Sequence, residues 1–558
     1  EIILLRNKNK HRIIGKFIEL IDKGEKNDSK YQFENGWGIE KKYKKMEEWW
    51  NDRLFHLRFA IRSPELLNDM LDQSLSEETM GILKEAKQAG IPTFVNPYYL
   101  SLLNVNEPKH LKGTDEAIRE YVLYSKELVE EFGHIIAWEK EDVVKEGKPN
   151  AAGWLLPGGH NIHRRYPEVS ILIPDTMGRA CGGLCSSCQR MYDFQSGHLN
   201  FNLDQLQPQE KWPDKLKRLM KYFEEDSQLR DILITGGDAL MSSDRSLKTI
   251  LDAVYQMALN KKKNNEKRPE GDKYAEMLRV RLGTRLPVYL PQRITPELIE
   301  LLADFKRKAS AIGMRQFVIQ THFETAMEVT PEAKDGIDKL LSAGWIITNQ
   351  QVFTAGASKR GHTAKLRKVL NDVGVLPYYT FSVKGYCENS FNFATNERAM
   401  QEQIEEKKIG LVPKSFYKEI EAFPDNPESI AGNIERIRQE ANLPFLATDR
   451  NVLNLPGVGK SLTYRTIGIT KDGRRILEFD HDHTRRHSPI IAKLGKIVIV
   501  ESKSVSKYLR QLEAMGENVE DYLDVYGYSI GETEPIIPIY KYPAYQYEAT
   551  EEFTNLVF

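Results

Sequence analysis

Three cysteines lie within eight residues of the sequence, and their spacing could hold a metal centre. Cys181, Cys185 and Cys188 stand in RACGGLCSSCQRMYDF, and the remaining cysteine of the 558-residue chain is Cys387. A structural zinc site takes four protein ligands, whereas a [4Fe–4S] cluster held by three thiolates keeps one iron open to another ligand. The spacing favours the cluster. The alternative is a zinc site completed by Cys387 or a nearby histidine.

Six short β-rich runs, separated by helical segments, must position this cysteine loop. They read VSILIP, DILITGG, LRVRLGT, FVIQTH, WIITNQ and PYYTFSV. Six alternations of strand and helix predict an α/β fold with a parallel sheet and right-handed crossovers, closed or partly closed into a barrel. The cysteine loop follows the first run, at the carboxyl end where such folds place their chemistry. Gly182 and Gly183 favour a loop over a helix there.

The pattern divides the chain into three parts. Residues 1–150 show helical spacing of apolar residues, residues 151–410 carry the alternation, and residues 411–558 have an organisation of their own. The last part contains a predicted hairpin that turns at residues 471–473. The charged insert NKKKNNEKRPEGDK, from Asn260, is predicted to be a solvated loop in one crossover.

Composition excludes several partners. Lys plus Arg number 79 and Asp plus Glu 80, so no positive excess indicates nucleic acid or an anionic membrane, and no apolar run is long enough to span one. Four cysteines fit a reducing compartment, and we expect a cytoplasmic protein. His481, His483 and His487 resemble metal ligands, but no thiolate accompanies them, and a solvated or hydrogen-bonded loop is the preferred interpretation.

The spacing C-x3-C-x2-C after the first barrel strand resembles the signature of radical S-adenosylmethionine enzymes. DILITGGDAL, RLGTRLPVYLPQRITPEL, THFE, NQQV, PYYTF and LPGVGK follow in the same order as similar motifs in the lysine 2,3-aminomutase family. WWNDRL, NPYYLSLL and HRRYPE resemble its helical N-terminal part, so the resemblance covers about residues 47–490. It implies a partial (β/α)6 radical S-adenosylmethionine barrel with a helical N-terminal domain and an α+β C-terminal region.

The resemblance implies two small-molecule cofactors besides the cluster. S-adenosylmethionine would bind the open iron, and its candidate contacts are Thr235, Gly236, Gly237, Asp238, Gln292, His322 and Gln350. For His322, Gln292 or Gln350 taken alone, a hydrogen-bonded core side chain is the simpler interpretation. Lys460, after a Pro-Gly-Val-Gly loop, would form the Schiff base with pyridoxal 5′-phosphate. Arg165 matches an arginine near that phosphate, and Arg164 is a second candidate.

Together these cofactors imply an amino acid 2,3-aminomutase, which moves the α-amino group from C2 to C3. Arg190 matches the arginine that holds the substrate α-carboxylate. Lysine 2,3-aminomutase uses two aspartates for the distal ammonium, and the matching positions here are Lys384 and Asn454. Glutamate 2,3-aminomutases resemble this chain in that pair, so the favoured reaction is L-glutamate to β-glutamate.

Other interpretations stay open from sequence. They are the same migration on lysine or another amino acid, a pyridoxal phosphate aminotransferase or decarboxylase with a structural cluster, and a non-catalytic metal-binding protein. The resemblance implies a reductant such as flavodoxin or ferredoxin, and we expect a homo-oligomer. Residues 389–558 lack cysteine, so the interfacial zinc of lysine 2,3-aminomutase is not expected.

Overall fold

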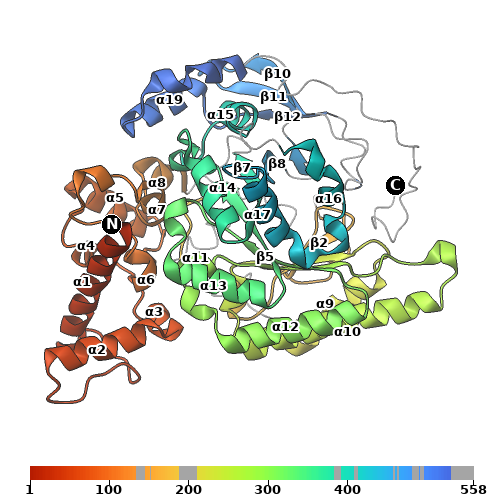
Figure 1. Ribbon diagram of the computed structural model, residues 1–558, viewed down its shortest axis with the longest axis horizontal. Helices are drawn as coiled ribbons and strands as arrows, with labels where there is room; N and C mark the ends of the chain where they lie inside the picture. The colour runs from red at the N-terminus through yellow and green to blue at the C-terminus, as the bar shows by residue number, and fades with distance from the viewer. Residues whose placement is uncertain are drawn as a thin grey trace.

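A nine-stranded, mostly parallel sheet forms the centre of the protein, with helical segments around it and a small second sheet near the C-terminal part (Figure 1). The structure is a computed structural model. It describes residues 1–132, 145–150, 152–187, 210–382, 391–407, 412–455, 459–461, 464–479, 489 and 496–528.

The central sheet follows the chain in order from its first strand to its ninth. Strands β2 to β8 are parallel, and β1 and β9 pair antiparallel at the two edges. The strands are β1 (Ile162–His163), β2 (Val169–Leu172), β3 (Asp231–Ile234), β4 (Arg279–Gly283), β5 (Gln316–Thr321), β6 (Ile346–Val352), β7 (Val375–Ser382), β8 (Arg450–Leu455) and β9 (Gly459–Ser461). All six β-rich runs are strands, which confirms the predicted α/β alternation and parallel sheet.

The parallel sheet continues beyond residue 410, where the sequence alternation was expected to stop. Strand β8 pairs in parallel with β7, and its first residues lie beside a buried group of charges. Arg367 donates from Nε and Nη2 to the two carboxylate oxygens of Asp449 at 2.9 and 3.0 Å, and Thr380 of β7 donates to the same carboxylate at 2.6 Å. This bidentate ion pair holds the beginning of β8 against β7.

Replacing Arg367 with Met is expected to lower the free energy of unfolding by about 3–5 kcal/mol, because a buried carboxylate loses its main partner. Burial opposes ionisation, yet Arg367 and Lys407 hold the pKa of Asp449 well below its ordinary value of 3.8. The stabilisation is therefore present above about pH 3.8 and is lost as pH falls through the lowered pKa. Urea unfolding at pH 7 would measure the change. Lys368→Met, at an exposed position of the same helix, is the control.

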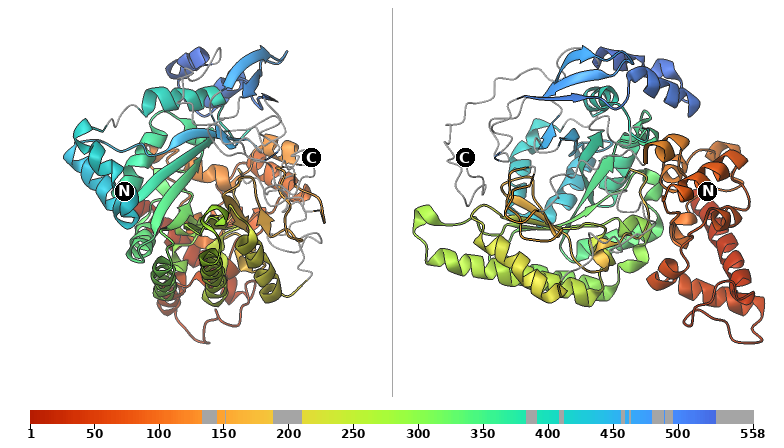
Figure 2. Two further views of the ribbon diagram at one scale, coloured as in Figure 1. Left: turned by 90° about the vertical axis from the view of Figure 1, so that its right-hand side faces the viewer. Right: turned by 180° about the vertical axis from the view of Figure 1, so that it is seen from behind.

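Helices connect the parallel strands and lie outside the sheet (Figure 2). Two of them begin with the same local signal: Thr295 and Thr330 accept from the backbone N–H of the third residue onward, and a proline follows each threonine. The helices of this part are α9 (Trp212–Glu225), α10 (Asp244–Glu266), α11 (Leu286–Tyr289), α12 (Pro296–Ala311), α13 (Pro331–Ser342), α14 (His362–Asp372), α15 (Asn396–Gln401), α16 (Tyr417–Glu421) and α17 (Ile430–Glu440).

The prediction of a solvated loop from Asn260 is wrong for the first half of that insert. Helix α10 continues to Glu266, and Lys261 is fully buried. Its Nζ donates to the carbonyl oxygens of Phe223 and Leu229 at 3.1 and 2.7 Å, and burial lowers the pKa of Lys261 to about 8. Two carbonyl acceptors compensate the ammonium, and its alkyl stem packs in the interior, so a lysine-rich segment remains helical.

The N-terminal part is helical, as its periodicity predicts. Its helices are α1 (Ile2–Asp22), α2 (Ile39–Trp50), α3 (Arg53–Arg58), α4 (Pro64–Met70), α5 (Glu77–Gln88), α6 (Pro97–Leu100), α7 (Glu116–Val122) and α8 (Lys126–Phe132). Asn96, which caps α6, donates from its side chain to the backbone oxygens of Gly182 and Tyr289 at 3.1 and 2.7 Å. Tyr99 donates to Glu328 at 2.7 Å. The N-terminal helices therefore contact the cysteine loop directly.

The second sheet contains the predicted hairpin. Strands β10 (Tyr464–Ile469) and β11 (Arg475–Phe479) pair antiparallel, and β12 (Ile497–Val500) completes the sheet. Gly473 has a φ of +84°, which suits the tight turn and confirms its predicted position. Helix α19 (Val505–Ala514) and the 3-10 segment η15 (Val519–Tyr528) follow. Among the described helices, none has the length and apolarity needed to cross a membrane.

Candidate functional site

The cysteine loop lies where the sequence places it, directly after the carboxyl end of β2. Cys181 and Cys185 are both partly exposed. Backbone hydrogen bonds hold the loop to the one that follows β3, where the N–H of Asp238 lies 3.0 Å from the carbonyl oxygens of Gly178 and Ala180. Cys181 and Cys185, two potential thiolate ligands, therefore lie on a loop whose backbone is held by hydrogen bonds.

Glycines allow the loops after β2, β3 and β4 to come close together. A Cβ at Gly237 would lie 2.3 Å from the carbonyl oxygen of Arg179, and one at Gly183 would lie 2.9 Å from the ring of Tyr289. Gly236 has a φ of +133°, a conformation that side chains disfavour. These close approaches, with the thiol donor set, fit the compact loop that a cluster ligated by closely spaced cysteines needs.

Asp238 holds two of these loops together. Its carboxylate accepts from the backbone N–H of Arg285 at 2.6 Å and from that of Leu240 at 3.0 Å. Asp238 is 3% exposed, and burial raises its pKa to about 6. The structure therefore gives this residue a role in organising the loops, while its contact with S-adenosylmethionine stays a prediction.

Arg285, just after β4, connects Cys185 of the cysteine loop with residues that follow β4 and β5. Its Nη1 lies 3.1 Å from Sγ of Cys185 and 2.6 Å from the hydroxyl of Tyr289. Nη2 donates to Glu328 at 2.8 Å, and Nε donates to the carbonyl oxygen of His322 at 3.0 Å. Arg285 lies in the RLGTRLPVYLPQRITPEL motif, and no role for this residue was predicted from the sequence. Its position just beyond a strand's carboxyl end was the available signal.

His322 follows β5, and its partly exposed side chain pairs with the fully buried side chain of Glu324. Its Nε2 lies 2.9 Å from Oε2 of Glu324, and the Tyr121 hydroxyl lies 3.4 Å from the same nitrogen. Burial and the Arg285 cation lower the pKa of His322 well below its ordinary value. Burial raises the pKa of Glu324 to about 8. Near neutral pH the imidazole is therefore neutral and Glu324 is mostly protonated.

Glu324→Gln is expected to flatten the pH dependence of stability. Because the folded-state pKa lies above the ordinary value of 4.5, the folded protein binds more protons than the unfolded chain between about pH 4.5 and 8. Its free energy of unfolding therefore falls as pH rises through that window, by at most about 1.4 kcal/mol per pH unit for one proton. Urea unfolding from pH 5 to 8 would measure the slope, with Glu332→Gln, at an exposed position, as control. Equal slopes in wild type and Glu324→Gln would contradict the assignment.

Among the remaining predicted contacts of S-adenosylmethionine, Thr235 and Gln350 lie near strand ends, and Gln292 lies in the 3-10 segment η8 (Pro291–Arg293) after α11. Thr235 follows β3, and a Cβ at Gly283 would lie 2.5 Å from its hydroxyl oxygen. Gln350 lies in β6 where the β6–β7 register shifts. Oε1 of Gln292 is buried and has no hydrogen-bond partner within the part of the chain that the structure describes. That amide oxygen is available to a ligand.

The two arginines of HRRYPE have different surroundings. Arg164 is 2% exposed and donates to Tyr222 and to the carbonyl oxygen of Pro167 at 2.8 and 2.7 Å, and it is also paired with Asp226. These internal partners make Arg164 a structural residue. Arg165 is partly exposed, with Nε 3.2 Å from His163. Arg165 therefore stays the candidate for the phosphate.

Asn454 and Lys460 lie opposite each other in the register of β8 and β9. The predicted substrate position and the predicted pyridoxal lysine, six positions apart in sequence, are therefore neighbours in one hairpin. Sequence alone did not reveal this pairing.

Other predicted residues fall outside the described residues. These are Cys188, Arg190, Lys384 and Cys387, together with His481, His483 and His487.

Comparison with known proteins identifies similar sequences. An uncharacterised KamA family protein of Methanocaldococcus jannaschii is 26% identical over 498 residues, covering 86% of this chain and 66% of that protein. An L-lysine 2,3-aminomutase of Methanococcus maripaludis is 27% identical over 333 residues, 60% of this chain and 64% of its own length. A glutamate 2,3-aminomutase of Clostridioides difficile is 28% identical over 339 residues, which cover 61% of this chain and 66% of that protein. The chain is similar to the KamA and lysine 2,3-aminomutase family.

The match spans just under two thirds of each of these three relatives. No protein-family model matches the chain. The chain is 27% identical to the lysine aminomutase and 28% identical to the glutamate aminomutase, so sequence identity alone does not decide the substrate.

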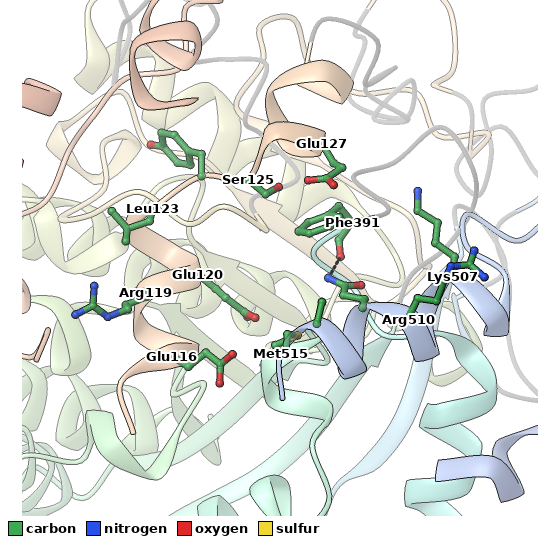
Figure 3. A pocket seen from close by; sticks show the side chains of 13 residues that line it. Glu116, Arg119, Glu120, Leu123, Ser125, Glu127, Phe391, Lys507, Arg510 and Met515 are labelled. Atoms are coloured by element: carbon green, nitrogen blue, oxygen red, sulfur yellow. Dashed lines mark hydrogen bonds between the residues drawn. The ribbon is translucent and has the colours of Figure 1, made fainter. Parts of the chain in front are cut away.

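A cavity of about 520 Å³ lies between α7, with the residues that follow it, and α19. Glu120 of α7 points toward the cavity, with Lys507 and Arg510 of α19 across from it (Figure 3). Burial and the charge of Glu324 raise the pKa of Glu120 to about 8. The hydroxyl of Ser186 donates to the backbone oxygen of Glu120 at 2.6 Å, which connects the cavity wall to the cysteine loop.

Proposed function

We propose that the chain is a radical S-adenosylmethionine, pyridoxal-phosphate-dependent amino acid 2,3-aminomutase built on the partial barrel of that class. The observation that supports this proposal most is the position of the cysteine loop. It follows the carboxyl end of β2, and glycines let it pack closely against the loops that follow the next two strands. The similarity to known 2,3-aminomutases supports the reaction type.

Each group would be held by residues that the sequence analysis predicts. Cys181, Cys185 and Cys188 would bind the cluster, and Lys460 with Arg165 would bind pyridoxal phosphate. The candidate contacts of S-adenosylmethionine are Thr235, Gly236, Gly237, Asp238, Gln292, His322 and Gln350. When bound, these groups supply reductive generation of a 5′-deoxyadenosyl radical and a conjugated system through which nitrogen migrates.

The protein's own work is binding, orientation and control of protons. The β8–β9 hairpin would keep Lys460 beside the substrate position Asn454. Glu324 would hold its proton near neutral pH, so that no second negative charge lies beside Glu328, whose Oε2 accepts from the backbone N–H of Glu324. Arg190 would bind the substrate α-carboxylate as a bidentate partner. Fixed orientation of this kind limits side reactions of a radical.

We infer L-glutamate as the substrate and β-glutamate as the product. Lys384 offers a cation and Asn454 a neutral hydrogen-bond donor for a distal carboxylate. A unit charge pair at about 4 Å and an effective dielectric near 20 is worth about 4 kcal/mol before desolvation. The same residues would repel or leave unpaired the ammonium of lysine, so charge favours an acidic side chain.

An anaerobic assay of the reconstituted holoenzyme tests this function. Glutamate, lysine and glutamine are each supplied with S-adenosylmethionine and reductant, and β-isomers are detected by chromatography. Glutamate is expected to turn over, and Lys384→Asp should lower that turnover about 10³-fold through charge repulsion. Lys365→Asp, at an exposed position of α14, is the charge-matched control.

The outcomes separate the alternatives. Preference for lysine would overturn the acidic substrate and leave the 2,3-migration standing. Transamination or decarboxylation without S-adenosylmethionine and reductant would identify a different class of pyridoxal enzyme. A holoprotein that converts no amino acid and cleaves no S-adenosylmethionine would be a non-catalytic metal-binding protein.

We further propose a homo-oligomer that receives electrons from a reductant such as flavodoxin or ferredoxin. Both expectations rest on the resemblance of the sequence to the lysine 2,3-aminomutase family.

A further inference from the structure

We propose that Arg285 sets the reduction potential of the iron–sulfur cluster through its contact with Cys185. The inference rests on the proposed function, since it requires a cluster on the cysteine loop. Arg285 would be a positioning residue, because it acts through the ligand sulfur and does not touch a reacting atom.

The hydrogens around Cys185 identify the guanidinium as the donor. Sγ of Cys185 lies 3.1 Å from Nη1 of Arg285 and 3.2 Å from the hydroxyl of Tyr289. That hydroxyl has one hydrogen, which it donates to the carbonyl oxygen of Leu184 at 2.9 Å. A guanidinium carries five N–H donors, so Nη1 can donate both to the phenolic oxygen and to sulfur.

Other buried groups hold Arg285 in this position. Its side chain is 8% exposed and pairs with Glu328, whose side chain is fully buried. Oε1 of Glu328 accepts from Arg285 and Tyr99, while Oε2 accepts from the backbone N–H of Glu324 at 2.6 Å. The rings of Tyr121 and Tyr289 lie 4.2 and 4.4 Å from the guanidinium carbon. Because Nε and Nη2 are occupied by His322 and Glu328, Nη1 stays directed at Cys185.

The electrostatic consequence has a definite sign. Reduction adds one electron, supplied by an external one-electron carrier, to a cluster already surrounded by thiolates, and no bond or proton transfer is required. A fixed cation and an N–H donor at a ligand sulfur stabilise the more negative, reduced state more than the oxidised state. Arg285 therefore raises the potential and makes the cluster easier to reduce.

Redox titration of the reconstituted holoprotein, followed by electron paramagnetic resonance, tests this role. Arg285→Gln is expected to lower the reduced-to-oxidised ratio at a fixed potential about tenfold, which is a midpoint about 59 mV more negative for one electron. Arg293→Gln is the matched control. Arg293 is 1% exposed and donates to the carbonyl oxygens of Leu240 and Ser242 at 2.7 and 3.0 Å, so it tests the loss of an equally buried arginine.

A second measurement needs no charge-removing variant. Protein labelled with ¹⁵N-arginine is expected to show a ¹⁵N hyperfine coupling to the reduced cluster, and Arg285→Lys in the same labelled background should lose it. If Arg285→Gln fails to fold, this measurement decides the question.

The possible results separate the inference from the function on which it rests. A wild-type protein that forms no four-iron cluster would overturn the proposed function. A normal cluster whose potential is unchanged in Arg285→Gln, or falls equally in Arg293→Gln, would overturn the role of Arg285. So would the absence of arginine coupling in the wild type.

Discussion

Cys185→Ala is expected to abolish formation of the radical and to lower isomerisation by at least about 10⁴-fold, an effect typical of removing a group essential to the chemistry. The cluster would lose one of three thiolates, and Arg285 would keep its buried charge without the sulfur that it contacts at 3.1 Å. Iron and sulfide content, the resonance of the reduced cluster and release of 5′-deoxyadenosine would measure the loss. Cys181→Ala and Cys188→Ala should behave alike.

The fourth cysteine provides the control for this experiment. Cys387→Ala should keep iron content and activity, because Cys387 lies outside the C-x3-C-x2-C spacing. If Cys387→Ala loses its iron while Cys185→Ala keeps a normal four-iron cluster, the ligand assignment is wrong.

Lys460→Ala is expected to remove both the visible absorbance of bound pyridoxal phosphate and all measurable isomerisation. The lysine amine is the covalent attachment point that the proposal requires, and the opposite position in the hairpin is the substrate residue Asn454. Absorbance spectra before and after reconstitution would measure the loss. Lys471→Ala, at the exposed tip of the β10–β11 hairpin, should retain the absorbance.

Borohydride reduction followed by peptide mapping gives an independent answer. A label on the peptide that contains Lys460 is expected. A label on another lysine would move the pyridoxal site and remove the argument that the β8–β9 hairpin joins cofactor and substrate.

The sequence predicted the strands that are rich in β-branched and aromatic residues, because burial on both faces gives parallel strands a clear apolar signal. It missed β8, which reads RNVLNL and alternates with asparagine. That strand is specified by tertiary contacts, chiefly the pairing of Arg367 with Asp449, and no local pattern reports an ion pair between residues 82 positions apart. The prediction of a solvated loop at Lys261 was wrong for the same reason, since the carbonyl oxygens that accept from its ammonium lie on other segments.

The candidate site was predictable only in its chemistry. The cysteine spacing and the placing of His322 after a strand could be read directly, because the carboxyl ends of parallel strands meet at one edge. The role of Arg285 could not, since its partners Cys185 and Glu328 lie 100 and 43 positions away. Nor could the opposition of Asn454 and Lys460, which depends on a register that the glycine-rich turn alone does not define.

The contact of Asn96 with the loops of the central sheet has a consequence for the order in which the nascent chain acquires its structure. The carboxamide lies 193 positions before Tyr289, whose backbone oxygen accepts from it. At a synthesis rate of about 5–20 residues per second, the N-terminal helices exist for about 10–40 s before this acceptor has been made. During that interval the surface that will meet the cysteine loop lacks this partner, so the N-terminal helices can complete their contact with the central sheet only after Tyr289 has been made.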